Sequence, residues 1–231
     1  MIDLMRLELK KVKMRYFIGG ILIIIVGLLF FANTSIYASV QETPKNSYSN
    51  ILKLVNMAVT ECFTIYGAVL ISKVIISEYV NRSALIMLAY PINPKLWMTA
   101  KLLVISLFVM IGTFLGNMCC TLFIVFRDRY WDIVNGTFSL QNLQEILSLT
   151  IITMFLNGFL ILFSFVVGMI KKSISATIVG SILMAFFLQI LLTQTESRYQ
   201  LILSGFVAIL VLFIFSGIIF KTSIKSISAT E

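Results

Sequence analysis

The chain has 231 residues, of which 59% are hydrophobic and only 12% are charged, whereas soluble domains average about 45–50% apolar and about 25% charged residues. A soluble globule of this size could not bury so much apolar side chain. The composition therefore excludes a cytosolic enzyme, a disordered chain and a secreted disulfide scaffold, and it indicates a bilayer protein. In such a protein the net charge of +8 records orientation, so we expect no nucleic-acid partner.

Missing residue types exclude several chemistries. The sequence contains no histidine, which removes intramembrane Ser–His proteases, HExxH metalloproteases and Cys–His processing enzymes. It contains no GxxxxGK[ST] motif, so the chain has no phosphate-binding loop of its own. Its three cysteines lie in apolar runs without zinc spacing. We therefore expect no catalytic residue, no metal site and no cofactor in this chain, and no enzymatic activity.

The first predicted element is an amphipathic helix over 1–15 that lies along the membrane surface. At 100° per residue its apolar side chains share one arc and its cations flank that arc, which is typical of an interfacial helix. A tail that only sets the topology would explain the charge as well. A cleaved signal peptide over 1–32 is a further alternative, but the apolar run that follows has full span length, which favours an uncleaved first span.

Six apolar stretches are long enough to cross a bilayer core of about 30 Å at 1.5 Å per residue. Their lengths predict helices rather than barrel strands, which are short and alternating. We therefore predict an all-α membrane protein with a single transmembrane domain. The predicted spans are 16–38, 54–76, 102–126, 146–170, 175–192 and 200–220.

The distribution of Lys and Arg predicts the orientation of these spans. Thirteen of the 18 basic residues fall on one side, in 1–15, 73–101, 171–174 and the tail after 220. Because cytoplasmic loops carry the excess of Lys and Arg, we predict a multi-pass protein with both termini in the cytoplasm.

The predicted cytoplasmic loop between the second and third spans contains a short helix over 83–89. Ser83 can cap it, and Leu85 and Leu88 supply an apolar face. Pro91 must end it, and Pro94 suits the first position of the next helix. Because a two-turn helix is marginal in water, we expect it to pack against a partner protein.

The loop from Glu78 to Lys101 resembles the segment between the second and third spans of type-2 ABC export permeases. The six spans and the surface helix also fit, so the resemblance covers essentially the whole chain. In that family the segment docks in a cleft of a separate ATPase. The residues that match, and that the resemblance implies as the ATPase contact, are Glu78, Arg82, Ser83, Leu85, Leu88 and Pro91, followed by Ala100-Lys101 at the entry to the third span.

The resemblance also implies partners, cargo and location. The partner ATPase would bind ATP and Mg²⁺, and a second copy or a paralogue of the permease would complete a dimer in a bacterial cell membrane. The connection at 193–199 is too short for re-entrant helices, and the larger outer loop is instead 127–145. This compact plan is similar to small permeases that export bacitracin, lantibiotics or other amphipathic peptides in antibiotic resistance and immunity. We therefore expect an amphipathic peptide or drug-like substrate.

Four polar side chains within the predicted spans are candidates for the substrate path: Glu61, Asn117, Asn157 and Gln189. A carboxylate within a bilayer usually faces a cavity or a partner, so Glu61 could meet a cationic substrate. It could equally be a structural, protonated glutamate. Interhelical hydrogen bonds would explain the three amides without any function.

Small residues four positions apart predict close helix packing, at Gly112/Gly116, Ser164/Gly168 and Ala176/Gly180. They do not distinguish the possible functions. The main alternative to an ABC permease is a secondary transporter or channel that works without an ATPase. A membrane anchor or assembly factor is a third possibility.

Overall fold

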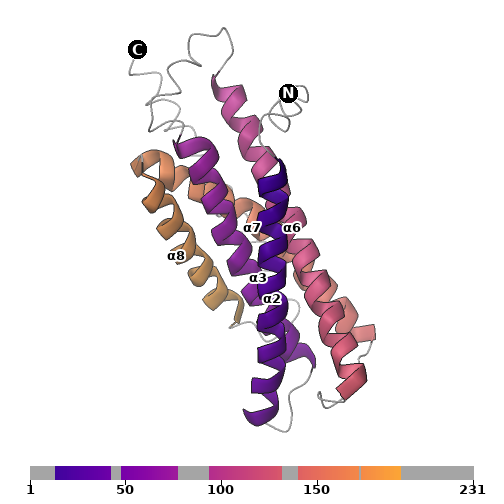
Figure 1. Ribbon diagram of the computed structural model, residues 1–231. Coiled ribbons are helices and arrows are strands. Elements are labelled where there is room, and N and C mark those ends of the chain that lie inside the picture. Colours follow the sequence, from indigo (N-terminus) through magenta and orange to yellow (C-terminus); the bar gives the residue numbers. More distant parts are fainter. Residues whose placement is uncertain (1–13, 43–47, 78–93, 132–139, 172, 194–231) are drawn as a thin grey trace.

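The computed structural model describes residues 14–42, 48–77, 94–131, 140–171 and 173–193. Every regular element in these ranges is helical (Figure 1). The elements are α2 (Met14–Glu42), α3 (Tyr48–Ile71), the π-helix η1 (Ser72–Ile76), α6 (Pro94–Trp131), α7 (Leu140–Lys171) and α8 (Ile174–Thr193).

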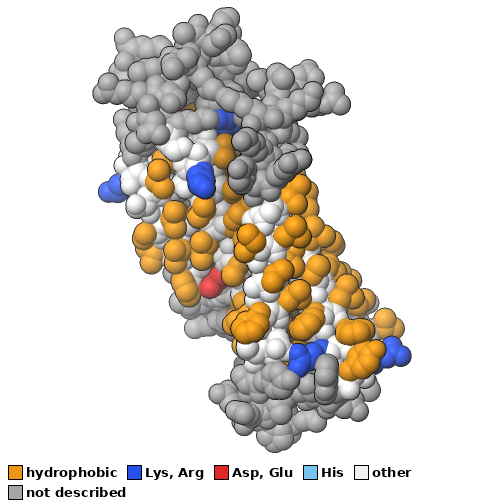
Figure 2. Space-filling model, viewed as in Figure 1, with side chains coloured by type: hydrophobic (Ala, Val, Ile, Leu, Met, Phe, Trp, Pro, Cys, Tyr) orange, Lys and Arg blue, Asp and Glu red, His pale blue; other side chains and the backbone are white. Residues whose placement is uncertain are grey.

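Four of the described segments are long and apolar enough to cross a membrane: Phe17–Ile36, Asn50–Ile76, Met98–Tyr130 and Asn142–Lys171. They coincide with the first four predicted spans. A shorter apolar stretch, Ile174–Phe186, lies in α8 where the fifth span is predicted. In Figure 2, hydrophobic side chains dominate the middle of the visible face, and basic side chains lie toward its two ends. The described part of the chain is therefore all-helical, as predicted, with four helices of membrane-spanning length and composition, while the full set of six spans stays a prediction.

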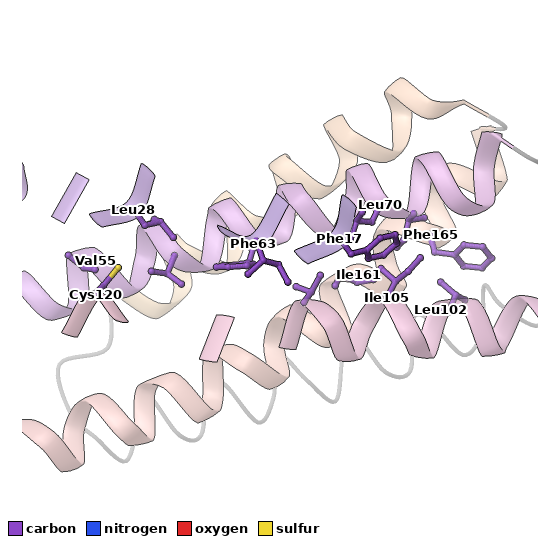
Figure 3. Packing of buried hydrophobic residues seen from close by; sticks show 14 of the residues in the cluster. Phe17, Leu28, Val55, Phe63, Leu70, Leu102, Ile105, Cys120, Ile161 and Phe165 are labelled. Atoms are coloured by element: carbon purple, nitrogen blue, oxygen red, sulfur yellow. The ribbon is translucent and has the colours of Figure 1, made fainter. Parts of the chain in front are cut away.

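Successive helices run in opposite directions around α3, which packs against α2, α6, α7 and α8. The core is built on this helix, and Phe63 lies at its centre (Figure 3). A Cβ atom built on Gly112 would lie 2.5 Å from the Phe63 ring, and one on Gly116 would lie 2.8 Å from it. The predicted close approach at these glycines is thus made by an aromatic ring of α3.

The third span continues farther than the sequence predicts. We expected a loop from residue 127 to 145, but α6 remains helical to Trp131 and α7 begins at Leu140. The prediction was wrong because it treated charged residues as a loop signal. In the structure the Arg127 guanidinium donates a hydrogen bond to the Asn33 side chain of α2, and the bundle buries Asp128. Both charges are therefore accommodated on a helix.

Several predicted elements lie outside the described residues. They are the surface helix over 1–15 apart from its last two positions, the short helix over 83–89, and the sixth span at 200–220. The start of the third helix can be compared directly, and α6 begins at Pro94 as predicted.

Candidate functional site

A cluster of buried polar side chains joins α3 to α7 in the interior of the bundle. The Thr64 hydroxyl donates a 2.8 Å hydrogen bond to the side-chain oxygen of Asn157. The Asn157 amide nitrogen donates in turn to the Thr60 carbonyl at 3.3 Å. One turn farther along, the Thr153 hydroxyl donates to the Asn56 side-chain oxygen at 3.2 Å. We call these five residues the α3–α7 polar cluster; it makes Asn157 a structural link between two spans.

Asn117 does not make, through its amide nitrogen, the interhelical hydrogen bond that the sequence allowed. It is 3% exposed, yet its amide nitrogen has no hydrogen-bond partner within the described part of the chain. The Thr150 hydroxyl on α7 is likewise buried and has no hydrogen-bond partner among the described residues. A buried donor without a hydrogen-bond partner destabilises a protein by about 1–3 kcal/mol. The described helices therefore leave two buried polar groups, on Asn117 and Thr150, without hydrogen bonds among themselves.

Glu61 lies near the middle of the second span. It is eleven residues after Asn50, where the apolar segment begins, which corresponds to about 16 Å of helix. The side chain is partly exposed, and it makes no hydrogen bond or ion pair with any residue that the structure describes. A carboxylate at this depth is expensive unless it meets a cavity or a partner.

The four predicted path residues lie at similar depths. Asn157 bonds to Thr60 and Thr64, which flank Glu61 on α3. Asn117 follows Gly116, which packs against the Phe63 ring. Gln189 on α8 is partly exposed. Its depth can be compared with that of Glu61 because Gly168 contacts both Ile76, at the end of the second span, and Thr177 on α8, so Ile76 and Thr177 lie at about the same level.

Glu61 is about 22 Å along α3 from Ile76, and Gln189 is about 18 Å along α8 from Thr177, at 1.5 Å per residue. Their depths therefore agree to within about one helical turn. We call Glu61, Asn117, Asn157 and Gln189 the middle polar layer. Their side chains are not equivalent, because Asn117 and Asn157 are buried whereas Glu61 and Gln189 are partly exposed.

The C-terminal end of α3 contains a feature that the sequence analysis did not identify. The α-helix changes to the π-helix η1 at Ser72, where the Ser77 backbone N–H bonds to the Ser72 carbonyl five residues earlier. The Lys101 ammonium on α6 lies 3.5 Å from the Val74 carbonyl oxygen. Lys101 is only 3% exposed, although the sequence places it among the loop cations. A single chain gives no pattern that separates a buried lysine from an interfacial one.

The predicted ATPase contact follows this feature directly in the chain. Residues 78–93 lie outside the described part, so the positions of Glu78, Arg82, Ser83, Leu85, Leu88 and Pro91 stay predictions. Their two attachment points are described: Ser77 follows η1, and Pro94 opens α6. Because α3 and α6 run antiparallel, both points lie at one end of the bundle.

The N-terminal part of α3 is linked to α7 by an ion pair. The Lys53 ammonium lies 3.2 Å from the Glu145 carboxylate, with exposed side-chain fractions of 41% and 23%. Within the residues that the structure describes, no group of three or more His, Cys, Asp and Glu side chains could hold a metal ion.

Long apolar helices packed around buried polar groups define a helical membrane protein. The chain is 30% identical to the uncharacterized protein YcbO of Bacillus subtilis (strain 168) over 193 residues, which cover 80% of this chain and 82% of that protein. The chain therefore belongs to the same family as YcbO. No protein-family model and no solved structure matches it.

Proposed function

We propose that this chain is the membrane-spanning permease subunit of an ATP-driven ABC exporter. A separate ATPase would bind ATP and Mg²⁺, and a second copy or a paralogue of this chain would complete a permease dimer. The proposal places the protein in a bacterial cell membrane with both termini in the cytoplasm. It rests on the resemblance of the 78–101 segment, and the antiparallel arrangement of α3 and α6 around that segment supports it most directly.

The segment is well placed to transmit force, because its two attachment points belong to different spans. Ile75 and Ile76 of η1 are 1% exposed, and η1 packs against α6, α7 and α8 as well as continuing α3. A displacement of residues 78–93 would therefore act on four helices. Rigid packing of this kind converts a local displacement into movement of whole elements.

The middle polar layer supports the proposal that the cargo is amphipathic. Asn117 and Asn157 are buried between helices, whereas Glu61 offers a partly exposed carboxylate without a described partner. We assign Glu61 as the first contact for a cationic group of a peptide or drug-like substrate. Asn117, Asn157 and Gln189 would line the path only after the helices separate.

The central experiment is co-purification of this chain with the proposed ATPase partner from its native membrane. Leu85→Asp and Leu88→Asp should abolish the association, because they place charge on the predicted apolar face. Met87→Asp is the matched control, since Met87 falls on the opposite face of the same predicted helix. All three variants must reach the membrane in equal amounts. Association that survives both leucine substitutions would contradict the assigned contact.

A secondary transporter or channel is the competing function. Such proteins commonly bind their ions where spans are broken near the midplane. In the described part of the chain, α2, α6, α7 and α8 have no interruption, and α3 changes geometry only at its end, in η1. Substrate transport driven by an ion gradient in proteoliposomes that contain only this chain would favour the competing function over the exporter.

A further inference from the structure

The π-helix η1 is an unusual element at a point where the function needs a defined geometry. A π-helix forms hydrogen bonds between residues five apart, so it adds about one residue to a turn, and such single-turn bulges in α-helices are frequent at functional sites. Here it spans Ser72–Ile76 at the end of the second span. It directly precedes the segment for which we propose an ATPase contact.

Side-chain donors satisfy several carbonyls in and around η1. The Ser72 hydroxyl donates to the Val69 carbonyl at 2.8 Å, and the Ser77 hydroxyl donates to the Lys73 carbonyl. Both bonds are local, so any α-helix with serine at these positions could make them. The contact from the Lys101 ammonium to the Val74 carbonyl is different, because it comes from another span, 27 residues away.

The burial of Lys101 makes this contact informative. Lysine is almost never fully buried unless it is paired, and removing its ammonium from water is costly. Its side chain is nevertheless 3% exposed, whereas Lys73 of η1 itself is exposed. The Val74 carbonyl oxygen, 3.5 Å away, is the polar group that η1 offers to the buried Lys101 ammonium.

We infer that Lys101 is a positioning residue: its contact with the Val74 carbonyl holds η1 in its π geometry and fixes the direction in which residues 78–93 leave α3. If η1 changed to α-helical geometry, its one extra residue would be lost, and the residues that follow η1 would be rotated by about 100° around the helix axis. Lys101 thereby connects the entry of α6 to the exit of α3. The inference deepens the proposed function, and its importance for transport rests on that function.

The test compares Lys101→Met with Lys73→Met in the full-length chain in lipid nanodiscs. Methionine keeps the length of the side chain and removes the ammonium, so Lys101→Met is expected to fold. Hydrogen exchange of the backbone amides at 72–77 should become about tenfold faster in Lys101→Met, because a hydrogen bond to a charged group is lost. Exchange in Lys73→Met should match wild type, and Lys101→Arg should restore most of the protection.

A second measurement separates this inference from the proposed function. If Lys101 positions the contact segment, Lys101→Met should also reduce co-purification of the ATPase, whereas Lys73→Met should not. Unchanged hydrogen exchange in Lys101→Met would overturn the positioning role whatever the ATPase does. Faster exchange at 72–77, in a chain whose Leu85→Asp variant still binds the ATPase, would support the positioning role and contradict the assigned ATPase contact.

Discussion

The hydroxyl of Thr64 in α3 donates a 2.8 Å hydrogen bond to the side-chain oxygen of Asn157 in α7, and the two residues are 93 positions apart in the chain. Both side chains are completely buried. In a bilayer no hydrophobic force holds helices together, so packing and interhelical hydrogen bonds carry more of the association. The Thr64–Asn157 bond therefore reports directly on the α3–α7 interface.

The first prediction is a coupling between these two residues. Thr64→Val removes the donor without changing the shape, and Asn157→Leu removes the acceptor. Each single variant should lower the free energy of unfolding, and the double-mutant cycle should give a coupling of about 0.6–2 kcal/mol. Unfolding in mixed micelles, followed by circular dichroism, measures it. Ser148→Ala is the control, because Ser148 is exposed and bonds only within α7. Strictly additive effects would contradict a direct bond.

The second prediction concerns the contact between Phe63 and the third span. Gly112→Ala places a methyl group 2.5 Å from a fully buried ring, so we expect destabilisation of about 1–3 kcal/mol from overpacking. Gly27→Ala should be neutral or slightly stabilising, since nothing lies within 4 Å of a Cβ at that position. Phe63→Leu should recover part of the loss in the Gly112→Ala background. Equal stability of the two alanine variants would show that the ring does not pack there.

The third prediction is that the ion pair between Lys53 and Glu145 contributes little. Its two side chains are partly solvent-exposed, and exposed pairs are worth about 0–1 kcal/mol. Lys53→Met should therefore cost less than Thr64→Val in the same unfolding assay, and the difference from wild type should shrink as salt is added. A larger, salt-independent loss for Lys53→Met would mean that the pair is shielded from solvent.

The fourth prediction concerns Glu61 and the cargo. If its carboxylate contacts a cationic group within the bilayer, Glu61→Gln should weaken apparent substrate affinity by about tenfold or more, because a charge-assisted contact is worth about 1.5–3 kcal/mol. Export and cell protection are compared at equal membrane levels. Glu145→Gln is the control, since it removes a carboxylate near the start of α7. Normal export by Glu61→Gln would leave Glu61 as a structural residue.

The fifth prediction concerns orientation. Ser83→Cys and Asn93→Cys should resist a membrane-impermeant thiol reagent in intact cells and react after the cells are opened. Asn135→Cys, between α6 and α7, should react from outside. Modification of position 83 or 93 in intact cells would place the proposed ATPase contact on the wrong side and would contradict the exporter proposal.

Much of the fold was predictable because bilayer thickness converts hydrophobic length into helices. The first four predicted spans match the four long apolar segments, and α6 begins at Pro94 because proline fits the first helical position. The loop at 127–145 was wrong for a physical reason. Arg127 binds Asn33 of α2, a partner that is 94 positions away and that no local pattern indicates.

The candidate site was predictable at the level of residues but not of contacts. An amide or carboxylate within an apolar span is visible in the sequence, so the middle polar layer could be named in advance. Its hydrogen bonds depend on how α3 and α7 are rotated, which is why bonded Asn157 and Asn117, whose amide nitrogen has no described partner, looked alike. The π-geometry of η1 has no signal in a single sequence.

The central position of α3 has a consequence for biogenesis. This helix is synthesised second among the spans, but the partners of Asn56, Thr60 and Thr64 lie on α7, which is synthesised two spans later. Until then the Thr60 and Thr64 hydroxyls can bond to carbonyls one turn earlier in the same helix. Insertion of the fourth span therefore adds the bonds between helices to a second helix whose threonine hydroxyls are already satisfied internally.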